Sequence, residues 1–168
     1  LGKKFRILEY KFVAALNENS LPKWIENSIS NSPVKNIGAY IKPIYRGATY
    51  FRGIDFHQDI IDFPGRNPDF VTIYIYLSEV SIKDSPLFIL PGSHKIGPSQ
   101  FPHDLYLSEN NKEIIYNDRK NSKENFFKIR PLIGNIGGCF CWHPYMLHGT
   151  YPAANINNNR ISLRILAE

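Results

Sequence analysis

The spacing of hydrophobic and polar positions changes near residue 36 and divides the chain into two parts. In the first part, apolar residues recur at the spacing of one helix face, at Leu8, Phe12, Ala15 and Leu16. A second apolar series follows a helix-start pattern at Ser20 and comprises Trp24, Ile25 and Ile29. The pattern therefore predicts two short helices within residues 1–35, packed on a larger body.

Beyond residue 36, short aromatic and β-branched runs alternate with turn residues, which is typical of many strands joined by turns. The clearest run is 70–77, where Thr72, Tyr74 and Tyr76 lie on one face and branched aliphatic residues on the other. Further strands are expected in residues 87–90, 126–129, 137–147 and 160–166, with a polar surface excursion over 108–125. Helices followed by many antiparallel strands predict an α+β chain, mainly β, with a jelly-roll core.

Composition and length favour one soluble domain. With 168 residues, 43% of them hydrophobic, the chain has enough material for one core and too little for two. No apolar run approaches the roughly 20 residues of a membrane span, and no signal pattern opens the chain, so we expect a cytoplasmic protein without a membrane partner. The net charge of +5 comes from scattered basic residues. This distribution argues against nucleic acid and suits a small anionic ligand.

The two cysteines, Cys139 and Cys141, lie two residues apart on a predicted strand, where side chains at this spacing share a face. A disulfide between them is not expected. We interpret them as buried thiols of an intracellular protein, because zinc sites usually show two such clusters.

Two histidines and one carboxylate have the composition of a metal site. His57 and Asp59 are separated by one residue, so on a strand both side chains leave the same face while Gln58 points away. A third ligand, His148, would come from a distant strand. Two imidazoles and a carboxylate on one side of an ion form the facial arrangement of non-haem Fe(II) oxygenases. The other histidines, His94, His103 and His143, are interpreted as structural or surface residues.

The strand after His148 predicts a second cluster. If His148 and Arg160 lie opposite each other on adjacent antiparallel strands, Arg160 faces inward together with Thr150, Ser162 and Arg164. An inward arginine needs a carboxylate partner, which its planar fork binds through two hydrogen bonds. The alternative is that these arginines face water. Arg164 is the competitor of Arg160 for an anionic ligand.

These features occur in the order found in one family. The chain resembles the phytanoyl-CoA dioxygenase family of Fe(II)- and 2-oxoglutarate-dependent oxygenases from about residue 45 to 165. The matching segments are His57-Gln-Asp59, the strand 71–77, Pro91-Gly-Ser-His94, and Trp142-His-Pro-Tyr-Met-Leu-His148-Gly-Thr150 running on to Arg160.

The resemblance implies a double-stranded β-helix, cupin-like, in which His57, Asp59 and His148 hold Fe(II). It implies further that Arg160 binds the far carboxylate of 2-oxoglutarate, that Thr150 hydrogen-bonds this cosubstrate, and that Tyr74 lines its pocket. Ser162 is a candidate cosubstrate residue because it shares the inward face with Arg160. The expected organisation is one oxygenase domain over 1–168, with a helical part at 1–35 and a jelly-roll core at 36–168.

The implied activity is a dioxygenase reaction in which O2 and 2-oxoglutarate are consumed, a small organic substrate is hydroxylated, and succinate and CO2 are released. Asp59 favours hydroxylation, because related halogenases have Gly or Ala at that position. Two alternatives stay open: a cupin-like module that binds a metal or ligand without turnover, and a zinc-dependent isomerase or hydrolase. The substrate and the oligomeric state are not predicted.

Overall fold

The structure is a computed structural model that describes residues 4–15, 48–50, 56–84, 86–99, 103–109, 112–150 and 160–168. The second predicted helix, around residues 20–29, lies outside these residues. The strands are β1 (Ile7–Ala15), β2 (Ala48–Tyr50), β3 (Val71–Tyr76), β4 (Phe88–Ile89), β5 (Leu105–Leu107), β6 (Glu113–Asp118), β7 (Lys123–Lys128), β8 (Arg130–Pro131), β9 (Cys139–Trp142), β10 (His148–Gly149) and β11 (Arg160–Ala167). Two 3-10 helices are described, η3 (Asp59–Asp62) and η4 (Ser93–Ile96).

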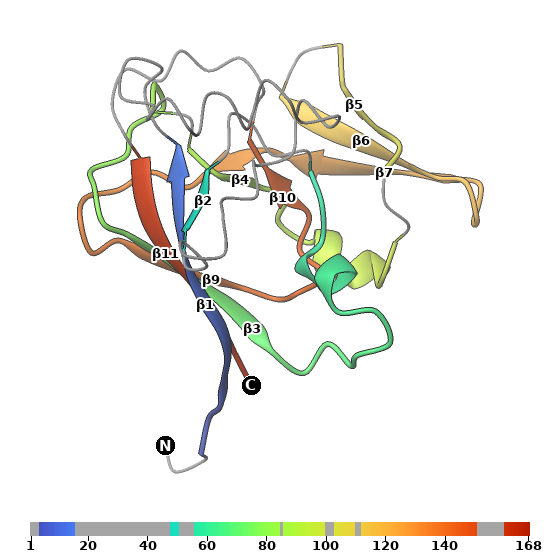
Figure 1. The fold of residues 1–168 in the computed structure, drawn as a ribbon. Coiled ribbons are helices and arrows are strands. Elements are labelled where there is room, and N and C mark those ends of the chain that lie inside the picture. The colour runs from blue at the N-terminus through green and yellow to red at the C-terminus, as the bar shows by residue number, and fades with distance from the viewer. Residues whose placement is uncertain are drawn as a thin grey trace, which may run out of the picture.

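Three sheets organise the described residues (Figure 1). The main sheet has the order β2-β1-β11-β3-β9, the second sheet has the order β10-β4-β8, and the third has the order β5-β6-β7. Most pairs are antiparallel, but β1 and β2 run parallel. The described part of the chain is therefore mainly β, as the sequence predicts.

Strand β3 confirms the predicted alternation and shows which face is inward. Thr72, Tyr74 and Tyr76 are buried, whereas Val71 on the other face is exposed. The inward polar atoms of Thr72 and Tyr76 have partners: the Tyr76 hydroxyl, for example, donates to the Leu132 carbonyl at 2.5 Å. Hydrogen-bonded hydroxyls lower the cost of burying this face.

The predicted first helix is wrong, because residues 7–15 form strand β1. This strand pairs antiparallel with β11 and parallel with β2, so its backbone groups are bonded between strands. Val13 is buried, whereas Tyr10 and Phe12 are exposed on the opposite face. Over nine residues the apolar positions fit both a helical and an alternating period, and pairing with β11 decides between them.

The predicted hairpin between His148 and Arg160 is also wrong. His148 in β10 pairs with Ile89 of β4, whereas β11 lies between β1 and β3 in the main sheet. The predicted inward face of β11 is nevertheless confirmed, because Arg160, Ser162 and Arg164 are all buried. The alternation within one strand fixes its faces whichever strand lies beside it.

The main hydrophobic cluster lies between the first two sheets. Its buried members are Val13, Tyr74, Tyr76, Val80, Leu87, Leu132 and Trp142. A second cluster around Leu90, Ile114 and Leu147 connects the second sheet to the third. In contrast to the prediction, Cys139 and Cys141 are exposed on β9; both are free thiols. No helix among the described residues is long and apolar enough to cross a membrane.

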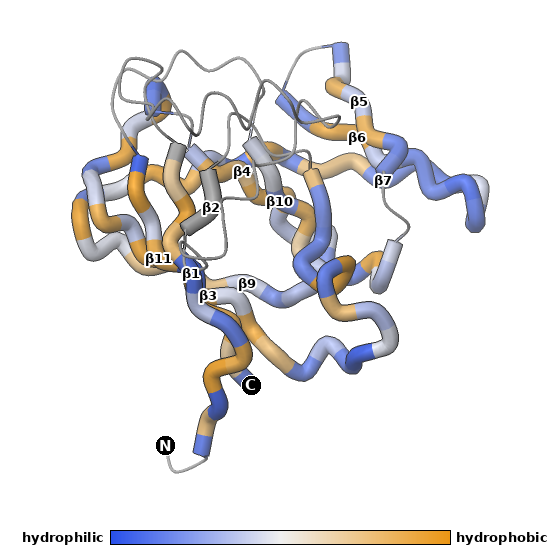
Figure 2. The backbone as a smooth tube through the Cα atoms, viewed as in Figure 1, coloured by the Kyte–Doolittle hydropathy of each residue, from blue (hydrophilic) through white to orange (hydrophobic). Residues whose placement is uncertain are grey.

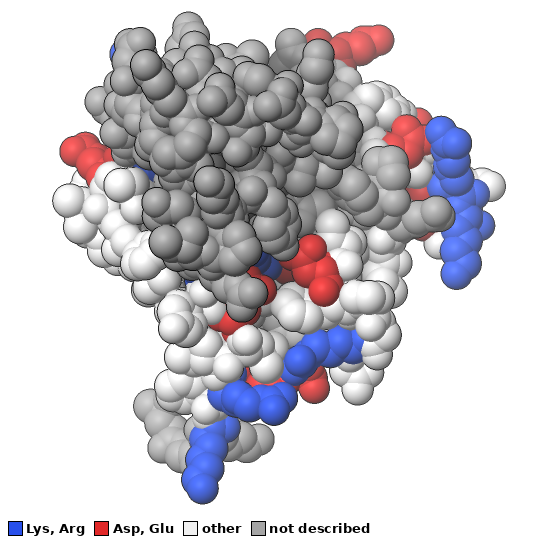
Figure 3. Space-filling view, in the orientation of Figure 1, with Lys and Arg blue, Asp and Glu red and all other residues white. Residues whose placement is uncertain are grey.

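The polar segment predicted as a surface excursion contributes strands to the third sheet. β6 and β7 pair over six positions, from Glu113 opposite Lys128 to Asp118 opposite Lys123, and they project from the body (Figure 1). The end of this hairpin is hydrophilic in Figure 2, and its Lys and Arg side chains are visible at the edge of the molecule in Figure 3. Elsewhere on the visible described surface, both signs of charge are interspersed.

Candidate metal centre and the inward face of β11

The structure brings His57, Asp59 and His148 together. His57 and His148 form an antiparallel bridge in which each backbone N–H donates to the other residue's carbonyl, at 2.9 and 3.0 Å. One ligand atom from each of the three side chains lies within 4.8 Å of the other two. His148 and Asp59 are buried and His57 is partly buried. The triad can therefore share one cation.

The orientation of His148 leaves one ring nitrogen for a metal. Its Nδ1 lies 2.9 Å from the Met146 carbonyl, which can only accept a hydrogen bond, so the proton sits on Nδ1. Nε2 is then the ring nitrogen that faces Asp59, 3.6 Å from Oδ1. Two ligands of one ion with bonds of about 2.1 Å can be separated by this distance.

The Pro91-Gly-Ser-His94 turn, distant in the sequence, contacts the residue before His148. Gly92 has a φ of 90°, a left-handed conformation that favours glycine, and it leads into η4. The hydroxyl of Ser93, at the start of η4, accepts a hydrogen bond from the backbone N–H of Leu147 at 2.8 Å. The predicted Pro-Gly-Ser-His turn therefore supports the residue next to a candidate ligand.

Asp59 does not lie on a strand, contrary to the prediction. Gln58 has an extended backbone, and Asp59 begins η3. The buried Gln58 side chain does point elsewhere: it donates to the carbonyls of Gly97 and Tyr145 and accepts from the N–H of Ser99, all at 2.9 Å. Gln58 thus connects the segment carrying His57 and Asp59 to the segments on both sides of the site.

The Asp59 carboxylate is surrounded by donors. Arg164 Nη2 donates to Oδ1 at 2.7 Å, while Thr72 Oγ1 and Trp142 Nε1 donate to Oδ2 at 2.6 and 3.0 Å. Burial alone would raise the pKa of Asp59. The charges of His148, Arg164 and His57 and the hydrogen bond from Thr72 outweigh burial and hold this pKa well below its usual range. Asp59 is therefore an anion at neutral pH.

Arg164 also reaches toward the surface. Its Nη1 lies 3.4 Å from Glu9 Oε1 on β1, and the same oxygen lies 2.9 Å from Lys11 Nζ. Charges of alternating sign thus run from Lys11 to Asp59. From sequence, Arg164 was expected only as a competitor of Arg160 for an anionic ligand. No local pattern indicated the contacts of Thr72, Trp142 and Glu9, because their partners are distant in the chain.

Arg160, in contrast, keeps unsatisfied donors. It is fully buried, and its Nε and Nη1 have no hydrogen-bond partner among the described residues. On the inward faces of β11 and β3, the hydroxyls of Ser162 and Tyr74 are among the other buried groups in the same situation. All three residues were predicted to contact a cosubstrate. Thr150, the fourth, is buried at 3% exposure.

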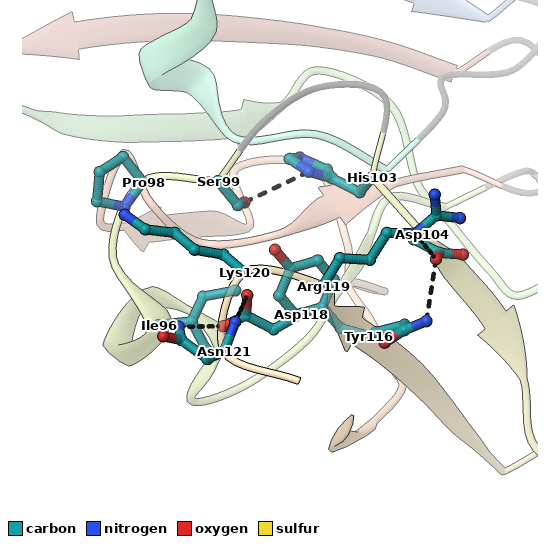
Figure 4. Close-up of a pocket in the computed structure, with 11 residues that line it drawn as sticks. Ile96, Pro98, Ser99, His103, Asp104, Tyr116, Asp118, Arg119, Lys120 and Asn121 are labelled. Atoms are coloured by element: carbon teal, nitrogen blue, oxygen red, sulfur yellow. Dashed lines mark hydrogen bonds and ion pairs between the residues drawn. The ribbon is translucent and has the colours of Figure 1, made fainter. Parts of the chain in front are cut away.

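The remaining histidines lie outside the triad. His94 and His143 have ring centroids 5.7 Å apart, and burial together with the nearby His94 lowers the pKa of His143. His103 contacts Ser99 in a cavity of about 760 Å³ beneath the β6–β7 hairpin (Figure 4). This cavity is lined by polar residues of both charges and by none of the triad residues.

A mainly β protein with two imidazoles and one carboxylate converging in a buried site has the donor set of mononuclear non-haem metal proteins. A family model described as phytanoyl-CoA dioxygenase matches residues 14–158. The chain belongs to the phytanoyl-CoA dioxygenase family.

Individual proteins resemble this chain in sequence or in fold. A probable alpha-ketoglutarate-dependent hypophosphite dioxygenase of Stutzerimonas stutzeri is 30% identical over 121 residues, which cover 67% of this chain and 37% of that protein. The crystal structure of SnoN, a non-heme alpha ketoglutarate dependent epimerase from nogalamycin biosynthesis, matches 98% of this chain and 46% of its own with a TM-score of 0.55 at 14% identity. EvdMO1 matches 99% of this chain and 28% of its own, with a TM-score of 0.55 at 13% identity. The chain thus spans less than half the length of these proteins.

Proposed function

We propose that this chain carries the active site of an Fe(II)- and 2-oxoglutarate-dependent dioxygenase that hydroxylates a small organic substrate and releases succinate and CO2. Family membership supports this reaction class, and the name of the Stutzerimonas relative agrees with it. His57, Asp59 and His148 are the proposed iron ligands. Arg160, Ser162, Tyr74 and Thr150 are the proposed 2-oxoglutarate residues.

The fit of 2-oxoglutarate rests on the unsatisfied donors of Arg160. A fully buried guanidinium with two nitrogens unbonded among the described residues is costly, because burial removes its hydration. The distal carboxylate of 2-oxoglutarate supplies both the opposite charge and two acceptor oxygens. The hydroxyls of Ser162 and Tyr74 can donate to the same carboxylate.

The fit of iron rests on the donor set. The Nε2 atom of His148, whose other ring nitrogen contacts the Met146 carbonyl, and an ionised Asp59 are donors of the kind that a divalent ion takes. When bound, Fe(II) with 2-oxoglutarate supplies the activation of O2 that oxidises an otherwise unreactive C–H bond. The protein's part is to bind and orient: Arg160 fixes one end of the cosubstrate, and the cluster around Leu87 and Trp142 limits the access of water.

The observation that carries the proposal is the convergence of His57, Asp59 and His148. It is tested by adding Fe(II) and 2-oxoglutarate to the protein without oxygen and recording the visible charge-transfer band of a chelated keto acid. We expect the band in the wild type and its loss in His148→Ala, and we expect succinate once O2 is admitted. Absence of the band from the folded wild-type protein would contradict the proposal.

A non-catalytic cupin-like binding module is the second candidate, because the same fold supports binding without turnover. It predicts the anaerobic band but no succinate after O2 is added. A zinc-dependent hydrolase or isomerase predicts turnover without O2. Succinate formation therefore separates the dioxygenase from both alternatives, and turnover without O2 separates the zinc enzyme from the binding module.

We also propose that the main sheet and the second sheet are the two halves of a double-stranded β-helix within one oxygenase domain. The hydrophobic cluster between these sheets supports this arrangement. The cytoplasmic location and the absence of a nucleic-acid partner stay predictions from sequence.

A further inference from the structure

We infer that Thr72 and Trp142 are positioning residues that restrict Asp59 to a single metal-binding oxygen, Oδ1. The inference deepens the proposed function and rests on the triad binding a divalent metal. It concerns how the carboxylate is presented, which is decided by hydrogen bonds that the protein makes with or without the ion.

The two oxygens of the Asp59 carboxylate differ in how many hydrogen bonds they accept. Each carboxylate oxygen offers about two lone-pair directions. On Oδ2 both are used, by Thr72 Oγ1 at 2.6 Å and by Trp142 Nε1 at 3.0 Å. On Oδ1 one is used, by Arg164 Nη2 at 2.7 Å. Among the described residues this leaves one direction for a cation, on the oxygen that lies 3.6 Å from His148 Nε2.

The two donors to Oδ2 are held rigidly by the main sheet. Thr72 on β3 and Trp142 on β9 are direct cross-strand partners, so their side chains leave the same face of the sheet side by side. Thr72 is fully buried, and Trp142 is 5% exposed within the main cluster. The indole N–H can only donate, and an ionised Asp59 can only accept, so this contact cannot reverse.

Single-oxygen binding has a consequence for the cosubstrate. An octahedral ion has six positions, and two imidazoles with one carboxylate oxygen leave three of them open. A keto acid that chelates through two oxygens needs two of these positions, and O2 needs the third. If Asp59 bound through both oxygens, it would compete with 2-oxoglutarate for a position. Thr72 and Trp142 therefore favour binding of the keto acid.

The test removes the donors and measures how the carboxylate binds. Thr72→Val deletes the hydroxyl with little change in shape, Trp142→Phe deletes the indole N–H, and Thr72→Ser is the matched control that keeps a hydroxyl. The probe is the Co(II) protein without oxygen. Infrared spectra of protein with isotope-labelled aspartate report the separation of the carboxylate stretches, which is wide for one-oxygen binding and narrow for two-oxygen binding. Titration with 2-oxoglutarate reports its affinity.

We expect the wide separation in the wild type and in Thr72→Ser. In the double variant Thr72→Val/Trp142→Phe we expect a narrow separation and an affinity for 2-oxoglutarate at least about tenfold lower, because two hydrogen bonds to a charged group no longer oppose two-oxygen binding. Unchanged separation and affinity in the double variant would overturn the inference. If the double variant does not fold, Thr72→Val decides in the same way. Failure of the wild-type protein to bind Co(II) would instead count against the proposed function.

Discussion

Two arginines on the same face of β11 have opposite environments. Arg164 is buried against the carboxylate of Asp59, with Glu9 also in reach, so its charge is compensated within the protein. Arg160, four residues earlier, is fully buried, and its Nε and Nη1 have no hydrogen-bond partner among the described residues. A buried cation with a partner stabilises the structure around it, whereas one with free donors is suited to receive an anion. The difference supports the proposed ligand-binding role of Arg160 and favours a structural role for Arg164.

The largest effect is expected for Arg164→Met, measured on the metal-free protein. Removing the guanidinium leaves the Asp59 carboxylate buried without its closest positive charge, which costs about 3 to 5 kcal/mol of unfolding free energy. Urea unfolding in the presence of a chelator measures this change. Arg119→Met is the matched control, because the Arg119 ion pair with Asp104 is exposed and contributes at most about 1 kcal/mol.

Saturating Co(II) should reduce the difference in unfolding free energy between Arg164→Met and the wild type, since a bound cation replaces the missing positive charge beside Asp59. A loss no larger than that of Arg119→Met would show that Asp59 and Arg164 are not coupled as the structure indicates.

The second prediction concerns Arg160→Met and the affinity for 2-oxoglutarate. Losing a two-hydrogen-bond contact with a carboxylate in a desolvated site costs on the order of 2 to 5 kcal/mol, or roughly 30-fold to several thousand-fold in affinity. Titration of 2-oxoglutarate into the Fe(II) protein without oxygen measures it. Metal affinity should change little, because Arg160 is not one of the triad residues.

Arg160→Lys should restore only part of this affinity, because an ammonium lacks the planar fork. Wild-type affinity for 2-oxoglutarate in Arg160→Met would contradict the ligand-binding role proposed for Arg160. It would also return Arg164 to consideration as the cosubstrate residue.

A smaller effect is expected for Ser162→Ala and Tyr74→Phe. Each removes one buried hydroxyl that has no partner among the described residues. If these hydroxyls bind the cosubstrate, each variant loses about 0.5 to 1.5 kcal/mol of 2-oxoglutarate affinity, a few-fold change in the dissociation constant. If they do not, the variants should match the wild type in this titration and gain slightly in thermal stability.

The smallest effect on stability is expected for Glu9→Gln, which changes the partner of Arg164 that lies nearer the surface. Glu9 Oε1 lies 3.4 Å from Arg164 Nη1, and the Glu9 side chain is a third exposed. Solvent therefore screens this contact, and its loss should lower the unfolding free energy by less than about 1 kcal/mol. Calorimetric melting should show a shift of a few degrees at most. A loss as large as that of Arg164→Met would mean that Glu9, rather than Asp59, is the main partner of Arg164.

The candidate site was predicted better than the pairing of its strands. His57, Asp59 and His148 converge, and Arg160 is buried, although β10 and β11 are not the predicted hairpin. The faces were right because alternation is a local property of each strand, whereas the identity of its neighbour is not. The same reason explains the error at β1, whose nine residues fit two periods and whose pairing with β11 lies far along the chain.

What the sequence determined by itself is the order and local character of its parts: the alternation of β3, the turn at Gly92, the His-x-Asp triplet and the inward face of β11. The tertiary structure decided which charges meet. Thr72, Trp142 and Arg164 contact Asp59 from positions 13, 83 and 105 residues away. No local pattern encodes such distances, because these contacts depend on which strands pair and in which register, and that is set by the packing of the whole core.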